Sequence, residues 1–119
     1  MIVQRGEIVL VDFPYSDQTG SKVRPALVVQ SDAWNRKLDD TILALITSSR
    51  QRRVGSNTQL SIDITTVEGI QSGLRIDSIV QCENLITYDR ALILRSLGSL
   101  PPATMSRVDQ CLKAALGIN

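Results

Sequence analysis

Residues 22–30, KVRPALVVQ, contain the pattern around which the fold can be built. Apolar side chains fill most of this stretch, as in a strand that enters a hydrophobic core. Arg24 stands at the start of the apolar run, and Pro25 restricts the backbone of Arg24 to extended conformations. The sequence therefore predicts a permanent cation, held in a fixed place, at the mouth of a buried strand.

Similar apolar stretches on both sides of this segment predict further strands. The almost continuously apolar TILALITS, residues 41–48, is typical of a central strand that is covered on both faces. Together the predicted strands span residues 7–15, 24–30, 41–48, 58–64, 77–86 and 91–98. Polar segments predict loops at 16–22, 31–40 (with room for one helical turn), 50–57 and 65–74, and a turn at 87–90.

The end of the chain has a different periodicity. From Pro101 onward, apolar side chains recur at helical spacing at Met105, Val108, Leu112, Ala115 and Leu116. Ser99 is the candidate N-cap, Pro102 suits the first turn and Gly117 the stop. About six short strands and one closing helix predict a mainly β fold, a compact and strongly bent β-barrel with a helix packed on it. At 119 residues, we expect one domain that spans residues 1–119.

Charge and hydropathy exclude several classes of protein. The net charge is +1, so any site for a polyanion must be a local cluster of cations. The N-terminus lacks the long apolar stretch and the cleavage site of a signal peptide, and no segment approaches the length of a membrane span. These features predict a soluble, cytoplasmic protein.

Histidine and cysteine usage narrows the possible chemistry. The chain has no histidine, which excludes histidine-based zinc sites and serine–histidine or cysteine–histidine catalysis. Cys82 and Cys111 have no CxxC spacing, so we interpret them as small buried hydrophobic residues, with a disulfide as the alternative.

Two polar residues at strand ends are candidates for a site. Arg24 precedes one apolar strand, and Thr47 ends the next one along the chain. Each also has an ordinary interpretation: Arg24 as a surface cation paired with Asp12 or Asp17, and Thr47 as a β-branched residue at a strand end.

The chain resembles the MazF/PemK family of toxin–antitoxin endoribonucleases over essentially its whole length. The resemblance rests on RGEIVLVDFPYSDQTGSKVRPALVV, followed by a connection that contains Asn35 and by TILALITS. Further matches are ENLITYD at 83–89, LGSL at 97–100 and the final amphipathic helix.

This resemblance implies a fold, an activity and partners. The expected fold is an SH3-like, MazF-type β-barrel with a C-terminal α-helix, which forms a homodimer. The expected activity is cleavage of single-stranded RNA (mRNA), without a metal or other cofactor, by a toxin that inhibits translation and growth. A cognate antitoxin protein is expected to block the site. The family's catalytic arginine and threonine fall on Arg24 and Thr47, and its base-contacting positions on Glu83 and Asn84.

The chemistry of RNA cleavage explains why a cation is placed at the mouth of a strand. When the 2′-hydroxyl attacks the phosphorus, negative charge builds on the free phosphate oxygens, and a guanidinium offers a rigid fork of donors that matches them. Around this pair the sequence places hydroxyl and cationic side chains that we expect to contact RNA, namely Lys22, Ser48, Arg50, Arg52 and Arg53. The alternative for the arginine cluster is an ordinary solvated face.

The chain departs from the family pattern at three points. Thr19 stands where some members carry a glutamate that acts as base, and Asp17 or Glu83 would have to substitute. Ile86 replaces an arginine, and aromatic residues are few, with Trp34 and Tyr15 as the candidates for base stacking. Trp34 has a second interpretation as a dimer or core contact. The alternative function is a catalytically inactive module that acts through protein–protein interaction.

Overall fold

The computed structural model describes residues 2–14, 21–48 and 56–119 of the chain. Strands dominate these residues. In chain order the elements are β1 (Glu7–Pro14), β2 (Ser21–Val28), α1 (Asp32–Asn35), β3 (Asp40–Ser48), β4 (Gln59–Ile62), α2 (Val67–Ser72), β5 (Ser78–Asp89), the 3-10 helix η2 (Arg90–Leu92), β6 (Arg95–Ser99) and α3 (Pro102–Leu116).

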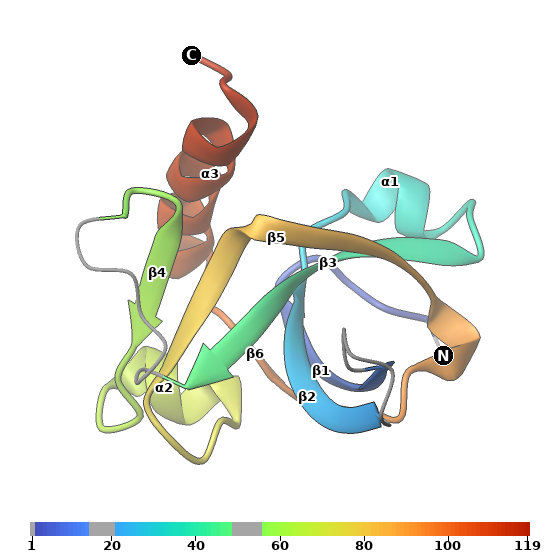
Figure 1. Ribbon diagram of the computed structural model, residues 1–119, viewed down its shortest axis with the longest axis horizontal. Coiled ribbons are helices and arrows are strands. Elements are labelled where there is room, and N and C mark those ends of the chain that lie inside the picture. Colours follow the sequence, from blue (N-terminus) through green and yellow to red (C-terminus); the bar gives the residue numbers. More distant parts are fainter. Residues whose placement is uncertain (1, 15–20, 49–55) are drawn as a thin grey trace.

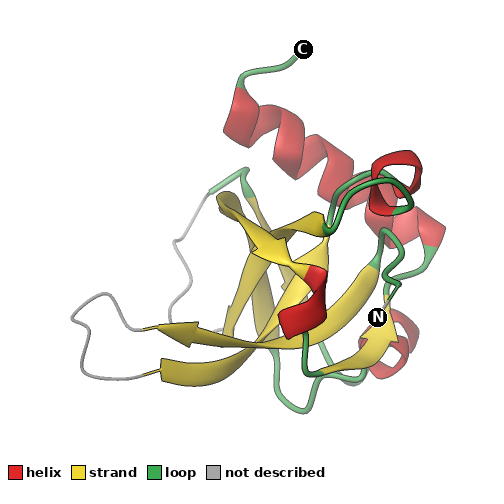
Figure 2. Ribbon diagram, turned by 90° about the vertical axis from the view of Figure 1, so that its right-hand side faces the viewer, coloured by secondary structure: helices red, strands yellow, loops and turns green. Residues whose placement is uncertain are grey.

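The described strands form one antiparallel sheet, in the order β4-β5-β3-β2-β1-β6. The sheet curls strongly, so that β1 and β2 turn beneath β3 and β5, and α3 lies across one end (Figure 1). A view from the side shows α3 above the strands (Figure 2). The predicted mainly β fold, a strongly bent barrel with a C-terminal helix, is confirmed, and the barrel takes the form of a curled half-barrel.

The two faces of the sheet bury separate hydrophobic clusters. One cluster joins the outer face to α3, and its largest members from the sheet include Ile8, Leu27 and Ile46. Met105 and Val108 reach it from α3. The other cluster fills the inside of the curl, from Val9, Val11, Ala26, Val28 and Leu43. Because successive strand residues face opposite sides, the almost continuously apolar sequence of β3 fits its burial on both faces.

The predicted helix at the end of the chain is confirmed, with one correction to its start. Pro102 is the first residue of α3, and Gly117 ends it with a positive φ of 71°. Ser99 is not the N-cap, because it is the last residue of β6 and the chain runs two residues further before the helix begins. Pro101 takes the N-cap position without a side-chain hydrogen bond.

The sequence prediction was wrong in four further places. The segment 65–74, predicted as a loop, contains α2. The strand predicted over 77–86 continues to Asp89, and the strand predicted over 91–98 begins only at Arg95, after η2. β2 already begins at Ser21, within the predicted loop. The helical turn allowed for between the second and third strands is present as α1.

Asn35 anchors α1 to the sheet through a buried polar network. Its side-chain amide donates to the Gln30 carbonyl at 3.0 Å, and its Oδ1 accepts from Gln30 Nε2 at 2.9 Å and from Thr41 Oγ1 at 2.7 Å. The Asn35 backbone carbonyl accepts from Arg90. Asn35 is 1% exposed, so these partners replace water completely.

Asn35→Ala is expected to destabilise the protein by about 2–3 kcal/mol, because Thr41 Oγ1, one N–H of Gln30 Nε2 and the Gln30 carbonyl would lose their buried partner. Urea unfolding measures the change. Asn84→Ala is the control: Asn84 is exposed on β5, and a surface substitution there should cost no more than about 0.5 kcal/mol. Equal losses in the two variants would contradict the structural role of Asn35.

The two cysteines confirm the interpretation made from their spacing. Cys82 on β5 and Cys111 on α3 are free thiols, both buried in the cluster between the sheet and α3. Burial raises the pKa of Cys82 to about 12, and it also raises the pKa of Cys111. Both residues are therefore neutral at physiological pH and act as small apolar side chains.

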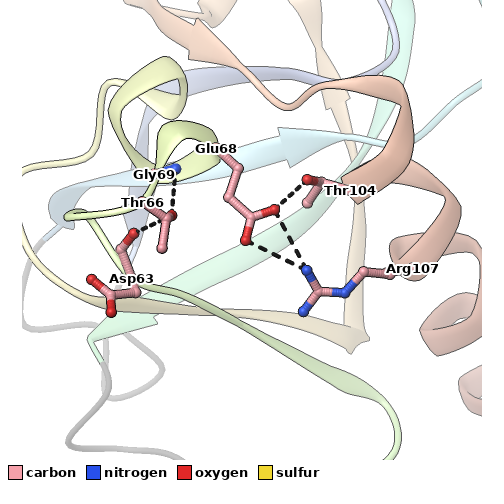
Figure 3. Close-up of polar contacts among 6 residues, drawn as sticks. All are labelled: Asp63, Thr66, Glu68, Gly69, Thr104 and Arg107. Atoms are coloured by element: carbon pink, nitrogen blue, oxygen red, sulfur yellow. Dashed lines mark hydrogen bonds and ion pairs between the residues drawn. The ribbon is translucent and has the colours of Figure 1, made fainter.

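α2 is held in place by its caps and by α3. The Thr66 side chain caps the helix by accepting from Gly69 N at 3.1 Å. From the first turn of α2, Glu68 accepts a hydrogen bond from Thr104 Oγ1 and pairs with Arg107 at 3.4 Å (Figure 3). These contacts fix the beginning of α2 against α3.

Two glycines allow the end of α2 to lie directly against β6. A Cβ at Gly73 would lie 2.1 Å from the Leu97 carbonyl oxygen, and one at Gly98 would lie 2.3 Å from the Gln71 carbonyl oxygen. Atoms at these distances overlap, so only glycine lets the two backbones approach this closely. Gly73 also has a φ of 75°, which ends the helix in the left-handed region.

Gly73→Ala is expected to destabilise the protein by about 3 kcal/mol, and Gly117→Ala by only about 1 kcal/mol. Both glycines end a helix with a positive φ, but a Cβ at Gly117 meets no atom within 4 Å. The difference between the two variants, measured by urea unfolding, isolates the contact between α2 and β6. If the two variants unfold alike, that contact contributes nothing beyond the strain of the left-handed backbone.

Candidate anion-binding site

The central feature of the site is a separation of two strands. β2 and β3 pair only over Ala26↔Leu45, Leu27↔Ala44 and Val28↔Leu43. Beyond this point β2 continues along β1, and β3 continues along β5. Pro25, the first residue past the last pair, has no N–H to donate to a ladder. The two strands therefore diverge, as Figure 1 shows at the ends of β2 and β3.

A cavity of about 420 Å³ lies where the strands diverge. Residues 73–76, which follow α2, form one wall of this cavity. The remaining lining residues come from the sheet: Leu10 of β1, residues 22–25 of β2, residues 46–48 of β3, Ser78 of β5, and Arg95 and Leu97 of β6. The cavity thus collects residues from five strands and from the segment after α2.

Arg24 and Thr47 come together at this cavity. Two residues past Ala26↔Leu45, where the strands no longer pair, the same register leads to Arg24 on β2 and Thr47 on β3, and both residues line the cavity. Arg24 is partly buried, and Thr47 is 8% exposed. The structure therefore brings into one place the two residues that the sequence singled out on different strands.

The charged residues in the described lining of the cavity are all of one sign. Its described lining includes four cations, Lys22, Arg24, Arg75 and Arg95, and no carboxylate. The ion pairs seen in residues 2–14, 21–48 and 56–119 use other arginines, Arg5, Arg90 and Arg107. Within these residues none of the four side chains has an ion-pair partner, and Asp12 does not pair with Arg24. Four cations without an ion-pair partner among the described residues, in a protein of net charge +1, make this cavity a candidate site for an anion.

Hydroxyl groups accompany the cations. Thr47 and Ser48 line the cavity from β3, and Ser78 lines it from the start of β5. Ser48 and Ser78 are paired across the two strands. Ser78 donates its hydroxyl hydrogen to the Ile76 carbonyl at 2.8 Å, which ties the wall segment to the sheet. Cations with hydroxyls beside them offer the donors that phosphate oxygens accept.

Arg75 and Arg95 were not predicted from the sequence. Arg75 lies in a segment outside the predicted strands, next to a helix that was not predicted. Arg95 belongs to the lining because β6 pairs with β1 with Arg95 opposite Leu10, which is itself opposite Pro25. Placing Arg95 at the cavity therefore requires the order of the strands in the sheet, which the sequence pattern alone does not give.

Two predicted RNA-contacting residues lie away from the cavity. Glu83 and Asn84 fall in β5 where its register with β3 shifts, between the pairs Ala44↔Leu85 and Leu45↔Gln81, and neither lines the cavity. The Glu83 carboxylate accepts hydrogen bonds from Thr58 at 2.9 Å and Gln59 at 2.6 Å. Asn84 lies 3.5 Å from Gln81 Oε1. A role for either in binding RNA stays a prediction.

The remaining candidates are placed as follows. Trp34 is 55% exposed on α1, outside the cavity lining, with Lys37 Nζ 5.4 Å from its ring centre. Ile86 is partly buried and packs on the cluster inside the curl. Tyr15, Asp17, Thr19, Arg50, Arg52 and Arg53 lie outside the described residues.

Metal-ligand clusters and membrane-spanning helices are both absent from the described residues. No group of three or more cysteine, aspartate or glutamate side chains within them is arranged to hold a metal ion. No helix among them is long and apolar enough to cross a membrane.

Comparisons with known proteins all point the same way. Residues 4–116 match the family model described as PemK-like, MazF-like toxin of type II toxin-antitoxin system. The chain is 30% identical to Endoribonuclease EndoA of Bacillus subtilis, over 99% of this chain and 97% of that protein. It is 28% identical to Endoribonuclease MazF6 of Mycobacterium tuberculosis, over 99% and 100% of the two chains. A solved mycobacterial endoribonuclease in complex with its cognate antitoxin superposes with a TM-score of 0.79 at 25% identity, covering 98% of this chain and 97% of that one.

Proposed function

Because the chain belongs to the family of PemK-like, MazF-like toxins of type II toxin–antitoxin systems, we propose that it is an endoribonuclease that cuts single-stranded RNA. The observation that supports this most directly is the cavity where β2 and β3 diverge, with Arg24 and Thr47 in its lining and only cations among the charged residues of its described lining. Cleavage of mRNA would stop translation and growth, which is the action of a toxin.

The proposed reaction is an internal displacement at phosphorus. The 2′-oxygen of one nucleotide forms a bond to the adjacent phosphorus, and the bond from phosphorus to the 5′-oxygen of the next nucleotide breaks. The 2′-hydroxyl loses its proton and the leaving 5′-oxygen gains one. The products are a 5′ fragment that ends in a 2′,3′-cyclic phosphate and a 3′ fragment that begins with a 5′-hydroxyl.

In this proposal Arg24 stabilises the charge that builds on the phosphate oxygens. Its guanidinium carries a positive charge, and its planar fork matches two oxygens of one phosphate. Placement on a strand, next to a proline, keeps the donors preorganised. Thr47 donates a hydrogen bond to a phosphate oxygen, and Lys22 and Ser48 hold the RNA backbone nearby.

Two partners belong to the same proposal. A cognate antitoxin would bind this toxin and cover the cavity, and the solved relative in complex with its own antitoxin supports this. A second copy of the chain would complete a homodimer. The alternative of a catalytically inactive binding module is not favoured, because Arg24 and Thr47 are both present and both line the cavity.

Purified protein incubated with a long single-stranded RNA is expected to yield fragments with 2′,3′-cyclic phosphate ends, identified by mass spectrometry. Because the proposal assigns charge stabilisation to Arg24, a metal chelator is expected to leave the rate unchanged. Intact RNA, or fragments with plain 3′-hydroxyl ends, would rule out the proposed reaction.

Arg24→Ala is expected to slow cleavage at saturating RNA by about 10²–10³-fold, the loss typical of removing one preorganised donor to a developing negative charge. Its thermal midpoint should stay within a few degrees of the wild type. Arg36→Ala, which removes an exposed cation at the end of α1, should leave the rate unchanged. A normal rate for Arg24→Ala would remove Arg24 from the mechanism.

Thr47→Val keeps the shape of the side chain and removes its hydroxyl. We expect at least a tenfold fall in rate, which corresponds to about 1.4 kcal/mol in the barrier. Thr47→Ser keeps the hydroxyl and should retain most of the activity. If valine and serine give the same rate, Thr47 contributes packing and not a hydrogen bond to the phosphate.

A further inference from the structure

We propose that Arg75 and Arg95 form a second phosphate-binding pair, which holds an RNA phosphate next to the one that is cut. This inference rests on the proposed function, because it concerns how RNA is positioned in the same cavity. It assigns a role to two residues that the sequence pattern does not mark, and it separates binding of the RNA backbone from the chemical step at Arg24.

The position of Arg95 follows from the sheet. Leu10 of β1 lies between Pro25 of β2 and Arg95 of β6, and the three residues are directly opposite one another. They therefore share a face, with Arg95 two strand spacings, about 10 Å, from Pro25. Arg24, the residue before Pro25, faces the opposite side of β2, so Arg95 and Arg24 reach the cavity from different faces of the sheet and do not form a single fork.

The position of Arg75 follows from α2. The contacts at Gly73 and Gly98 press the end of α2 onto β6, and the chain then continues as the cavity wall through Leu74, Arg75 and Ile76. Leu97 is both the residue that Gly73 touches and part of the lining, only two positions from Arg95. The same contact therefore brings the segment of Arg75 beside the strand of Arg95.

The electrostatics of the pair favour an anion as its ligand. Arg75 and Arg95 are both exposed, and within residues 2–14, 21–48 and 56–119 neither has an ion-pair partner. No carboxylate in the described lining neutralises them. Two cations side by side at the edge of a cavity repel each other. A backbone phosphate relieves this repulsion, because its two free oxygens can accept hydrogen bonds from both side chains.

RNA fits the cavity better than an isolated anion does. Two groups of cations, one on β2 and one on β6 and the adjoining wall, match a ligand with charges repeated along a chain. The same cavity has apolar lining residues, among them Leu10, Leu74 and Leu97. A nucleotide can place its base or ribose against such a surface while the phosphates at its two ends meet the cations.

The pair is expected to act on binding and not on the chemical step. Removing both arginines should raise KM and the Kd for RNA at least tenfold, while kcat at saturating RNA changes less than threefold. Removal of each cation that binds a phosphate should also flatten the plot of log affinity against log salt by about 0.7. Arg24→Ala should have the opposite profile, with a large fall in kcat.

The experiment compares Arg75→Ala/Arg95→Ala with a charge-matched control, Arg36→Ala/Lys113→Ala, which removes two exposed cations outside the cavity. The probe for binding is a labelled RNA with 2′-O-methyl groups throughout, which leaves no free 2′-hydroxyl and so blocks the proposed reaction. Its Kd is measured by fluorescence anisotropy from 50 to 200 mM salt. Steady-state cleavage of unmodified RNA gives kcat and KM, and Arg75→Lys/Arg95→Lys tests whether charge alone suffices, with partial recovery expected.

Each outcome decides between the two proposals. If the double variant weakens RNA binding and flattens the salt dependence relative to the control, the phosphate pair is supported, even if the wild type proves unable to cut RNA. If the wild type cuts RNA and the double variant matches the control in Kd, KM and salt dependence, the pair is refuted and the proposed function stands. If the variant keeps its RNA affinity but no longer binds a glutamate-rich peptide, the pair serves a protein ligand and the inference is wrong.

Discussion

Backbone contact between α2 and β6 is the constraint on which the cavity depends. At Gly73 and Gly98 the carbonyl oxygens of the neighbouring element occupy the space that a side chain would need. Glu68 fixes the beginning of α2 to α3 through Thr104 and Arg107, as Figure 3 shows, so the short helix is held at both ends. These contacts set the position of residues 73–76, which form one wall of the cavity. A six-residue helix would not be stable alone, and here it is a rigid part of the site because tertiary contacts hold it.

The strongest features of the fold were predictable because they depend on local pattern. Strands β1, β2 and β3 are visible in the sequence as apolar runs, and α3 is visible as apolar residues at helical spacing. Burial of an element on one or both faces dictates which of its positions are apolar. Arg24 and Thr47 were also identified as candidates from the sequence. In the structure both residues line the cavity where β2 and β3 diverge. Each of these residues lies near the end of an apolar strand that is visible in the sequence, and the two strands are neighbours in the sheet. For this reason both could be predicted from the pattern of the individual strands.

The features that were missed depend on contacts between distant segments. α2 leaves Val67 and Ile70 exposed and buries Gly69 and Ser72, so the usual apolar stripe of an amphipathic helix is absent. Arg75 and Arg95 are 20 residues apart in the chain, and the packing of α2 on β6 brings their segments to the same cavity. The helix cap at Ser99 failed for a similar reason, because pairing of β6 with β1 places that residue in the sheet. In each case a tertiary contact overrode a local preference.

The unneutralised cations of the cavity also affect how the protein responds to its solvent. With no carboxylate among the described lining, their mutual repulsion opposes the compact state whenever the cavity holds only water and weakly bound ions. Any multivalent anion that enters relieves this repulsion and, because it binds the folded chain in preference to the unfolded one, raises the apparent stability by mass action. Phosphate or sulfate buffers would therefore make the protein more heat-resistant. If the proposed function holds, these anions also compete with RNA for the cavity, so the conditions that best preserve the purified protein are those in which it works least well.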